Sequence, residues 1–107
     1  MSAGRFRCPV TLEAPVLTLT PDGAQVLVHV EAGTDFAGIR LLRQAEAAEA
    51  DRLSGVATHE LRLRARSDLA AGWRIRAAGK LHRVLSVAEE TGRRPQLICL
   101  TEVEEET

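Results

Sequence analysis

The chain has 107 residues, enough for one domain with a real core and too few for a second module of similar size. Its 14 Lys and Arg residues nearly balance its 15 Asp and Glu residues, which argues against a strongly basic nucleic-acid-binding protein. The sequence contains no apolar run of the roughly 20 residues that a membrane span needs and no signal-peptide pattern, so we expect a cytoplasmic protein without a membrane partner.

The first third of the chain reads as extended structure. Apolar and polar residues alternate over residues 8–13, which predicts a first strand, and Pro15 is expected to end it. A further extended piece is predicted over residues 16–20. The sequence Pro21-Asp22-Gly23 is a strong turn signal before a strand predicted over residues 25–31, where three valines share one face.

The pattern changes to a helical one after Gly33. Residues 37–53 are rich in strong helix formers and are followed by Ser54-Gly55, a good helix C-cap, so the sequence predicts one helix here. Its apolar stripe is shallow, because three of its members are alanine or lie at an end. The helix could therefore lie on the rest of the domain or project from it.

Residues 58–87 predict three consecutive strands. Residues 58–66 alternate strictly between apolar and arginine side chains, and residues 73–77 repeat this division. A tight reversal at Ala78-Gly79-Lys80 leads into a strand over residues 81–87, which carries apolar residues on parts of both faces. Such a strand is typical of a barrel or of a subunit interface.

The chain is predicted to end with one more strand. A polar loop over residues 88–95 precedes a strand over residues 96–103. Because apolar residues occupy both faces of this strand, it is expected to be central in the sheet or covered by another subunit. Residues 104–107 form an acidic tail.

No catalytic, metal or cofactor site is expected. His29, His59 and His82 are isolated in the sequence, and no phosphate-binding loop, zinc motif or nucleophile motif accompanies them. Cys8 and Cys99 lie far apart and lack metal or redox spacing, so both are interpreted as buried thiols.

The arginine stripe on the central strands admits two interpretations. It can keep an exposed sheet face soluble by pairing with Glu60, Asp68 or Glu102, or it can contact phosphates or another subunit's carboxylates. Direct nucleic-acid binding by a small β-barrel is an alternative function. The scarcity of aromatic side chains for base stacking argues against it. The stripe comprises Arg62, Arg64, Arg66, Arg74 and Arg76.

The order of these elements resembles that of the phage head-tail joining proteins, the head closure or stopper family. The likeness covers most of the chain and is strongest after Thr58, where a Thr-His strand runs into an Arg-rich strand, a Gly-Lys hairpin and a final strand with an acidic end. The matching positions are Thr58, His59, Arg62, Arg64, Gly72, Trp73, Ile75, Gly79, Val84, Val87, Leu97 and Leu100.

The resemblance implies a fold and a role. The fold is a single mainly β domain over residues 1–107, a small antiparallel SH3-like barrel of about six strands, with the helical insertion over residues 34–56 between the second and third strands. The role is non-enzymatic: a homo-oligomeric ring subunit that joins the portal or adaptor ring to the tail terminator or tail tube. Double-stranded DNA would pass through the ring without sequence-specific contact.

The resemblance also implies contacts and a location. The protein would assemble in the cytoplasm and end in the neck of a phage or gene transfer agent particle, and the abundance of Arg and Ala suits a GC-rich genome. Neighbouring-ring contacts are expected at Glu102, Glu104 and Glu105. Contacts between ring subunits or with DNA are expected at Arg62, Arg64, Arg66, Arg74, Arg76, Arg40 and Arg43.

Overall fold

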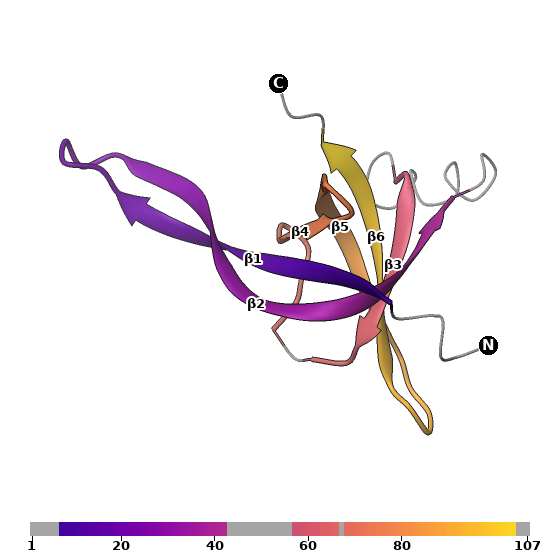
Figure 1. The fold of residues 1–107 in the computed structure, drawn as a ribbon. Helices are drawn as coiled ribbons and strands as arrows, with labels where there is room; N and C mark the ends of the chain where they lie inside the picture. The colour runs from indigo at the N-terminus through magenta and orange to yellow at the C-terminus, as the bar shows by residue number, and fades with distance from the viewer. Residues whose placement is uncertain (1–6, 43–56, 67, 105–107) are drawn as a thin grey trace.

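The described part of the chain is a closed antiparallel β-barrel (Figure 1). The computed structural model describes residues 7–42, 57–66 and 68–104. The strands follow one another around the barrel in the order β1-β2-β3-β6-β5-β4, which confirms the predicted small antiparallel barrel. Their bounds are Cys8–Leu19 for β1, Gln25–Leu41 for β2, His59–Arg64 for β3, Arg74–Ala77 for β4, Lys80–Glu90 for β5 and Gln96–Glu104 for β6.

The alternation in the sequence builds the core of the barrel. Leu61 and Leu63 of β3 point inward and are fully buried, while Arg62 and Arg64 between and beyond them point outward. Trp73 is buried just before β4. The other buried members of the core come from all the remaining strands and from the loop before β4: Val10, Leu12, Ala37, Leu69, Ile75, Ala77, Val84, Leu97 and Cys99.

The helix predicted from Ala37 is wrong over its first residues, because β2 continues to Leu41. Ala37 is buried and Ile39 packs on the core, while Gly38 pairs with Arg62 of β3, so this stretch completes the barrel wall. Pairing with β3 overrides the helix propensity of these residues. The predicted insertion over residues 34–56 thus begins as strand, and residues 43–56 lie outside the described residues. No helix in the described ranges is long and apolar enough to cross a membrane.

The strands β1 and β2 extend well beyond the barrel. The register pairs β1 with β4 only at residues 10–13 and pairs β2 with β3 only at residues 38–41. Residues 14–19 and 25–30 have only each other as strand neighbours, and they project as a two-stranded ribbon (Figure 1). We call residues 14–30 the arm. It lengthens the molecule to 52 Å, against 28 and 26 Å in the other two directions.

The arm leaves the barrel at a register shift between Leu12 and Glu13 of β1. Leu12 pairs with Gly33 and Glu13 pairs with Glu31, so β2 holds one extra residue at this point. Such a bulge bends a strand and increases its twist, which directs the arm away from the barrel. Pro15 does not end β1 as predicted, since it lies where β1 is an edge strand and an edge tolerates a missing N–H.

The arm ends in a turn held by its own side chains. The Thr20 backbone N–H donates to the Ala24 carbonyl over 2.8 Å, and the Gly23 N–H donates to the Thr20 carbonyl over 2.9 Å. Gly23 has φ 89°, a conformation that glycine adopts without strain. The Thr20 hydroxyl also hydrogen-bonds Asp22, so the tip is a defined turn that fixes the register of the arm.

Candidate interaction surface

The arginines around Glu60 form a cluster of ion pairs on the outer face of the barrel. Arg40 Nε lies 3.3 Å and Arg62 Nε 3.2 Å from Glu60 Oε2, and Arg62 Nη1 lies 3.5 Å from Glu90 Oε1. Partial burial opposes the ionisation of Glu60, but hydrogen bonds from Arg40 and Arg62 outweigh it and lower the pKa of this carboxyl. Glu60 is therefore charged at neutral pH and neutralises part of the arginine stripe.

A second group of pairs lies on the β4 side of the barrel. Arg66 donates to both carboxylate oxygens of Asp68 over 2.6 and 2.8 Å, and its guanidinium lies 5.8 Å from the centre of the Trp73 ring. Arg76 Nε donates to Glu13 over 2.9 Å, which ties β4 to the base of the arm. The pairs of Arg62 with Glu60 and of Arg66 with Asp68 agree with the interpretation in which the stripe keeps the sheet face soluble.

The acidic residues predicted to contact a neighbouring ring also have partners within the chain. Glu102 pairs with Arg83, and Glu104 Oε2 lies 3.4 Å from Arg74 Nη2. In the described part of the chain, buried Nε of Arg74 and Oε1 of Glu104 have no hydrogen-bond partner, so this pair is incompletely satisfied. Arg64 is exposed, with no ion pair among the described residues, while Arg43 and Glu105 lie outside them.

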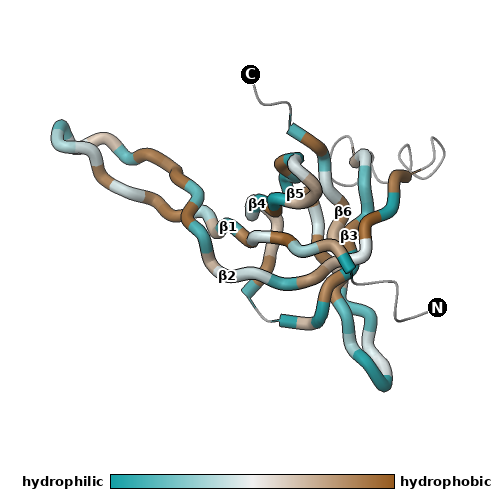
Figure 2. Tube along the Cα trace, in the orientation of Figure 1, coloured by the Kyte–Doolittle hydropathy of each residue, from teal (hydrophilic) through white to brown (hydrophobic). Residues whose placement is uncertain are grey.

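The arm carries most of the large exposed apolar side chains of the described residues. Its register places Leu17 opposite Leu27, with Leu19 next to them on the same side, and these three are 65%, 57% and 71% exposed. We call them the leucine face. The opposite side is a valine face, formed by Val16, Val26, Val28 and Val30. Figure 2 shows the apolar colouring along both strands of the arm.

Apart from Pro15 near its base, the arm lacks the features that protect a free edge strand. Among residues 14–30 the only charged residue is Asp22, at the tip, and both strands are flanked by no third strand. Isolated two-stranded ribbons are marginal in water, and natural edge strands usually carry charges that prevent association. The arm is therefore the strongest candidate for a surface that a partner covers.

Sequence reasoning missed this surface, although a signal was present. Over residues 16–19 and 26–30, apolar side chains occur on both faces of both strands, and Lys, Arg, Asp and Glu are absent. A strand that is apolar on both faces must be central in a sheet or covered by a partner. The first option fails here only because no third strand lies beside the arm, and the sequence does not reveal that fact.

The three histidines make contacts with other parts of the fold. His82 is buried, with Nδ1 3.0 Å from Thr101 Oγ1, and its ring packs edge-on against His59 at 5.1 Å. Burial lowers the pKa of His82 to about 4, so it is neutral at pH 7. His29 Nε2 donates to the Gly72 carbonyl over 2.8 Å and so ties the arm base to the loop before β4.

The described residues offer no metal centre. Residues 7–42, 57–66 and 68–104 contain no group of three or more His, Cys, Asp and Glu that could hold an ion. Cys99 is buried, which raises the pKa of its thiol to about 12 and makes it a poor nucleophile at neutral pH. Cys8 is a second free cysteine and is partly buried. The prediction of two buried thiols is thus correct for Cys99, whereas Cys8 is only partly buried.

Comparisons with known proteins give one matching family and two structures with a similar fold. The model of the phage head completion protein family matches residues 1–105, while no curated protein matches the chain significantly. The solution structure of protein SF1141 from Shigella flexneri 2a superposes with a TM-score of 0.75 and 21% identity, covering 98% of this chain and 100% of that one. A chain from the virion of a native gene transfer agent particle has a TM-score of 0.63 and 20% identity, covering 91% and 93%. At such identities these structures show the shared fold.

Proposed function

Because this chain belongs to the phage head completion protein family, we propose that it is a structural component that joins the head of a phage-like particle to its tail. The family match over residues 1–105 is the observation that carries this proposal. A similar fold in a chain of a gene transfer agent virion supports it, since that chain is part of an assembled particle. In finer detail, we propose a ring of identical subunits between the portal or adaptor ring and the tail terminator or tail tube.

Exposed side chains on the arm and on the barrel support a role in assembly. A subunit with apolar side chains exposed on both sides of a projecting arm is incomplete as a monomer, since such patches on soluble proteins mark sites of association. The ion pairs on the barrel can serve the same role. Arg40 and Arg76 remain 48% and 53% exposed at the side chain, so each can contact a carboxylate of a neighbouring subunit while it keeps its own partner.

The proposed contact with DNA is nonspecific. A particle neck must pass DNA of any sequence, so attraction between arginines and phosphates is sufficient and base-reading side chains are unnecessary. Pairing with Glu60, Asp68 and Glu104 weakens the positive field of Arg62, Arg66 and Arg74. Arg64 is thus the member of the stripe best placed for phosphate contact.

Loss of this chain is expected to separate heads from tails. In a particle-producing strain that lacks the gene, we expect DNA-filled heads and free tails in place of joined particles, because the connecting layer is missing. Negative-stain electron microscopy and transfer or infection assays measure the result. Purified wild-type chain, added to mixed heads and tails from that strain, should restore joined particles. Normal numbers of tailed particles in the strain without the gene would overturn the proposed function.

A further inference from the structure

Most arginines of the barrel strands are paired with carboxylates, but a few are not. Arg64, Arg93 and Arg94 are exposed and have no ion pair among residues 7–42, 57–66 and 68–104. Their guanidinium groups therefore keep their full charge for a partner outside the chain. The arginines that pair with a carboxylate of the same chain are Arg40, Arg62, Arg66, Arg74, Arg76 and Arg83.

The three unpaired arginines lie together at one end of the barrel. Arg64 ends β3 and pairs in register with Gln96, which begins β6. Arg93 and Arg94 come just before Gln96, in the turn over residues 91–95 that we call the hairpin turn. Paired Cα atoms are at most about 5.5 Å apart and one residue spans at most about 3.6 Å, so Arg94 lies within about 13 Å of Arg64. Figure 1 shows the β5–β6 hairpin projecting from the barrel, away from the end at which β6 stops.

We propose that this end of the barrel binds the phosphate groups of duplex DNA, through Arg93 and Arg94 of the hairpin turn together with Arg64. The inference rests on the proposed function, because it names the part of the subunit that faces DNA in a particle neck. The hairpin turn thereby gains a role beyond joining β5 to β6.

The nearby carboxylates do not neutralise these arginines. Glu90 accepts a hydrogen bond from Gln96 Nε2 over 2.7 Å and lies 3.5 Å from Arg62 Nη1, so its charge is already compensated. Glu89 is exposed and has no ion pair in the described part of the chain. Three positive charges therefore face one uncompensated negative charge. Like charges held this close repel one another, and a bound polyanion relieves that repulsion.

The composition of the hairpin turn favours a nucleic acid over a protein partner. Its sequence is Thr-Gly-Arg-Arg-Pro, fully exposed and without a large aliphatic or aromatic side chain. The centre of a protein–protein interface is apolar, whereas protein–DNA interfaces are polar and strongly positive. Duplex DNA carries one charge per about 1.7 Å of its axis, so a stretch of about 13 Å offers several phosphates to the three arginines. The major groove also admits a two-stranded ribbon such as this hairpin.

Fluorescence anisotropy with the purified full-length chain tests the contact. The probe is a labelled DNA duplex of arbitrary sequence, titrated at several salt concentrations between about 50 and 200 mM. Three phosphate contacts predict a slope of about −2.7 for the logarithm of affinity against the logarithm of salt concentration. The double variant Arg93→Glu, Arg94→Glu should bind DNA about tenfold or more weakly, with a slope of about −1, because two of the three contacts are lost.

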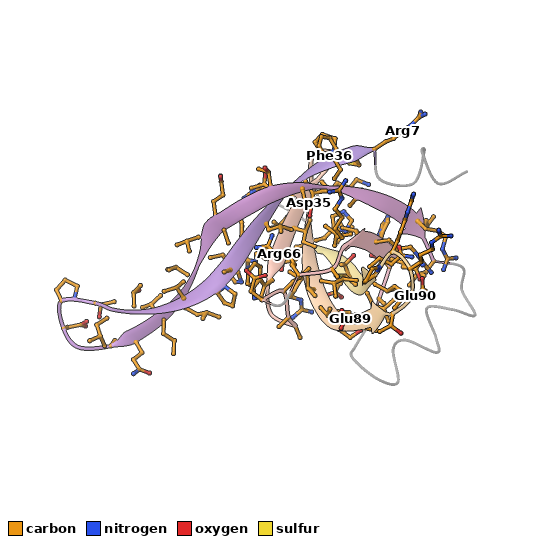
Figure 3. All side chains as sticks on the ribbon, turned by 90° about the horizontal axis from the view of Figure 1, so that it is seen from below. Arg7, Asp35, Phe36, Arg66, Glu89 and Glu90 are labelled. Carbon is orange, nitrogen blue, oxygen red and sulfur yellow. The ribbon has the colours of Figure 1, made fainter. Side chains whose placement is uncertain are left out.

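A matched variant at the other end of the barrel controls for net charge. Lys80 begins β5, whereas the hairpin turn follows its last residue, and Figure 3 shows Arg7 apart from Glu89 and Glu90. Arg7 and Lys80 are exposed and have no ion pair among the described residues. The double variant Arg7→Glu, Lys80→Glu changes the net charge by the same amount and should bind DNA nearly as tightly as the wild type. Because all four positions are exposed, both double variants should melt like the wild type.

The outcomes separate this inference from the proposed function. Equal DNA affinities of the two double variants, or no binding by the wild type at about 50 mM salt, would overturn the inference. Poly-L-glutamate serves as a second probe. Binding of this polymer as tight as that of DNA would show a site for acidic protein and would also overturn the inference. None of these results touches the joining of heads to tails, which the strain without the gene tests separately.

Discussion

Replacing Leu61 by Ala is expected to lower the free energy of unfolding by about 3–4 kcal/mol, a large fraction of the roughly 5–15 kcal/mol that stabilises a small domain. Leu61 is fully buried on β3, where the register places it between Ile39 of β2 and Cys99 of β6. The truncation removes apolar contacts from the middle of a closed barrel whose walls are fixed by hydrogen bonds, so the cavity cannot collapse easily. Urea unfolding followed by Trp73 fluorescence measures the change.

The same chemical change on the arm provides the control. Leu19 is 71% exposed, so Leu19→Ala should change the unfolding free energy of the isolated chain by only about 0.5 kcal/mol or less. If Leu19→Ala destabilised the isolated chain as much as Leu61→Ala does, the arm would be part of the core of the monomer. The description of the arm as an uncovered surface would then be wrong.

Acidification is expected to destabilise the barrel through His82. The pKa of His82 is about 4 in the folded chain and near 6.5 in the unfolded chain, so between these values the unfolded state binds more protons. The contribution of neutral His82 is therefore complete above pH 6.5 and is lost as the pH falls towards 4. The shift corresponds to about 3 kcal/mol. Unfolding free energies measured at intervals from pH 7 to pH 4 test this expectation.

A variant isolates His82 from the other titrating groups. Carboxylates such as Glu60 and Asp68 also have lowered pKa values and contribute at the acidic end, and His59 beside His82 has a pKa lowered by burial and by Lys80. The informative quantity is thus the difference between the wild type and His82→Gln. The variant should lose most of the pH dependence between 6.5 and 5. Equal slopes for the two proteins would show that His82 does not titrate as described.

The sequence was sufficient to predict the strands that have one apolar face and one polar face. Leu61 and Leu63 alternate with Arg62 and Arg64, so β3 and its inward face could be predicted without a structure. The strand over residues 37–41 could not be predicted in this way, because its residues favour a helix locally. They form a strand only through pairing with β3, which is a contact between distant parts of the chain.

The candidate surface was harder to predict than the barrel. The sequence indicated Glu60, Asp68 and Glu102 as partners of the arginine stripe, and the first two do pair with Arg62 and Arg66. Glu102 instead pairs with Arg83, since only the β5–β6 register brings them opposite each other. The arm could not be predicted from the sequence, because Pro15 commonly ends a strand. In addition, the exposure of a strand depends on whether other strands lie beside it in the fold.

A cryo-electron microscopy reconstruction of the neck of the assembled particle tests the central claim most directly. We predict a closed ring of these six-stranded barrels between head and tail. A neck that contains no copy of this barrel would contradict the account.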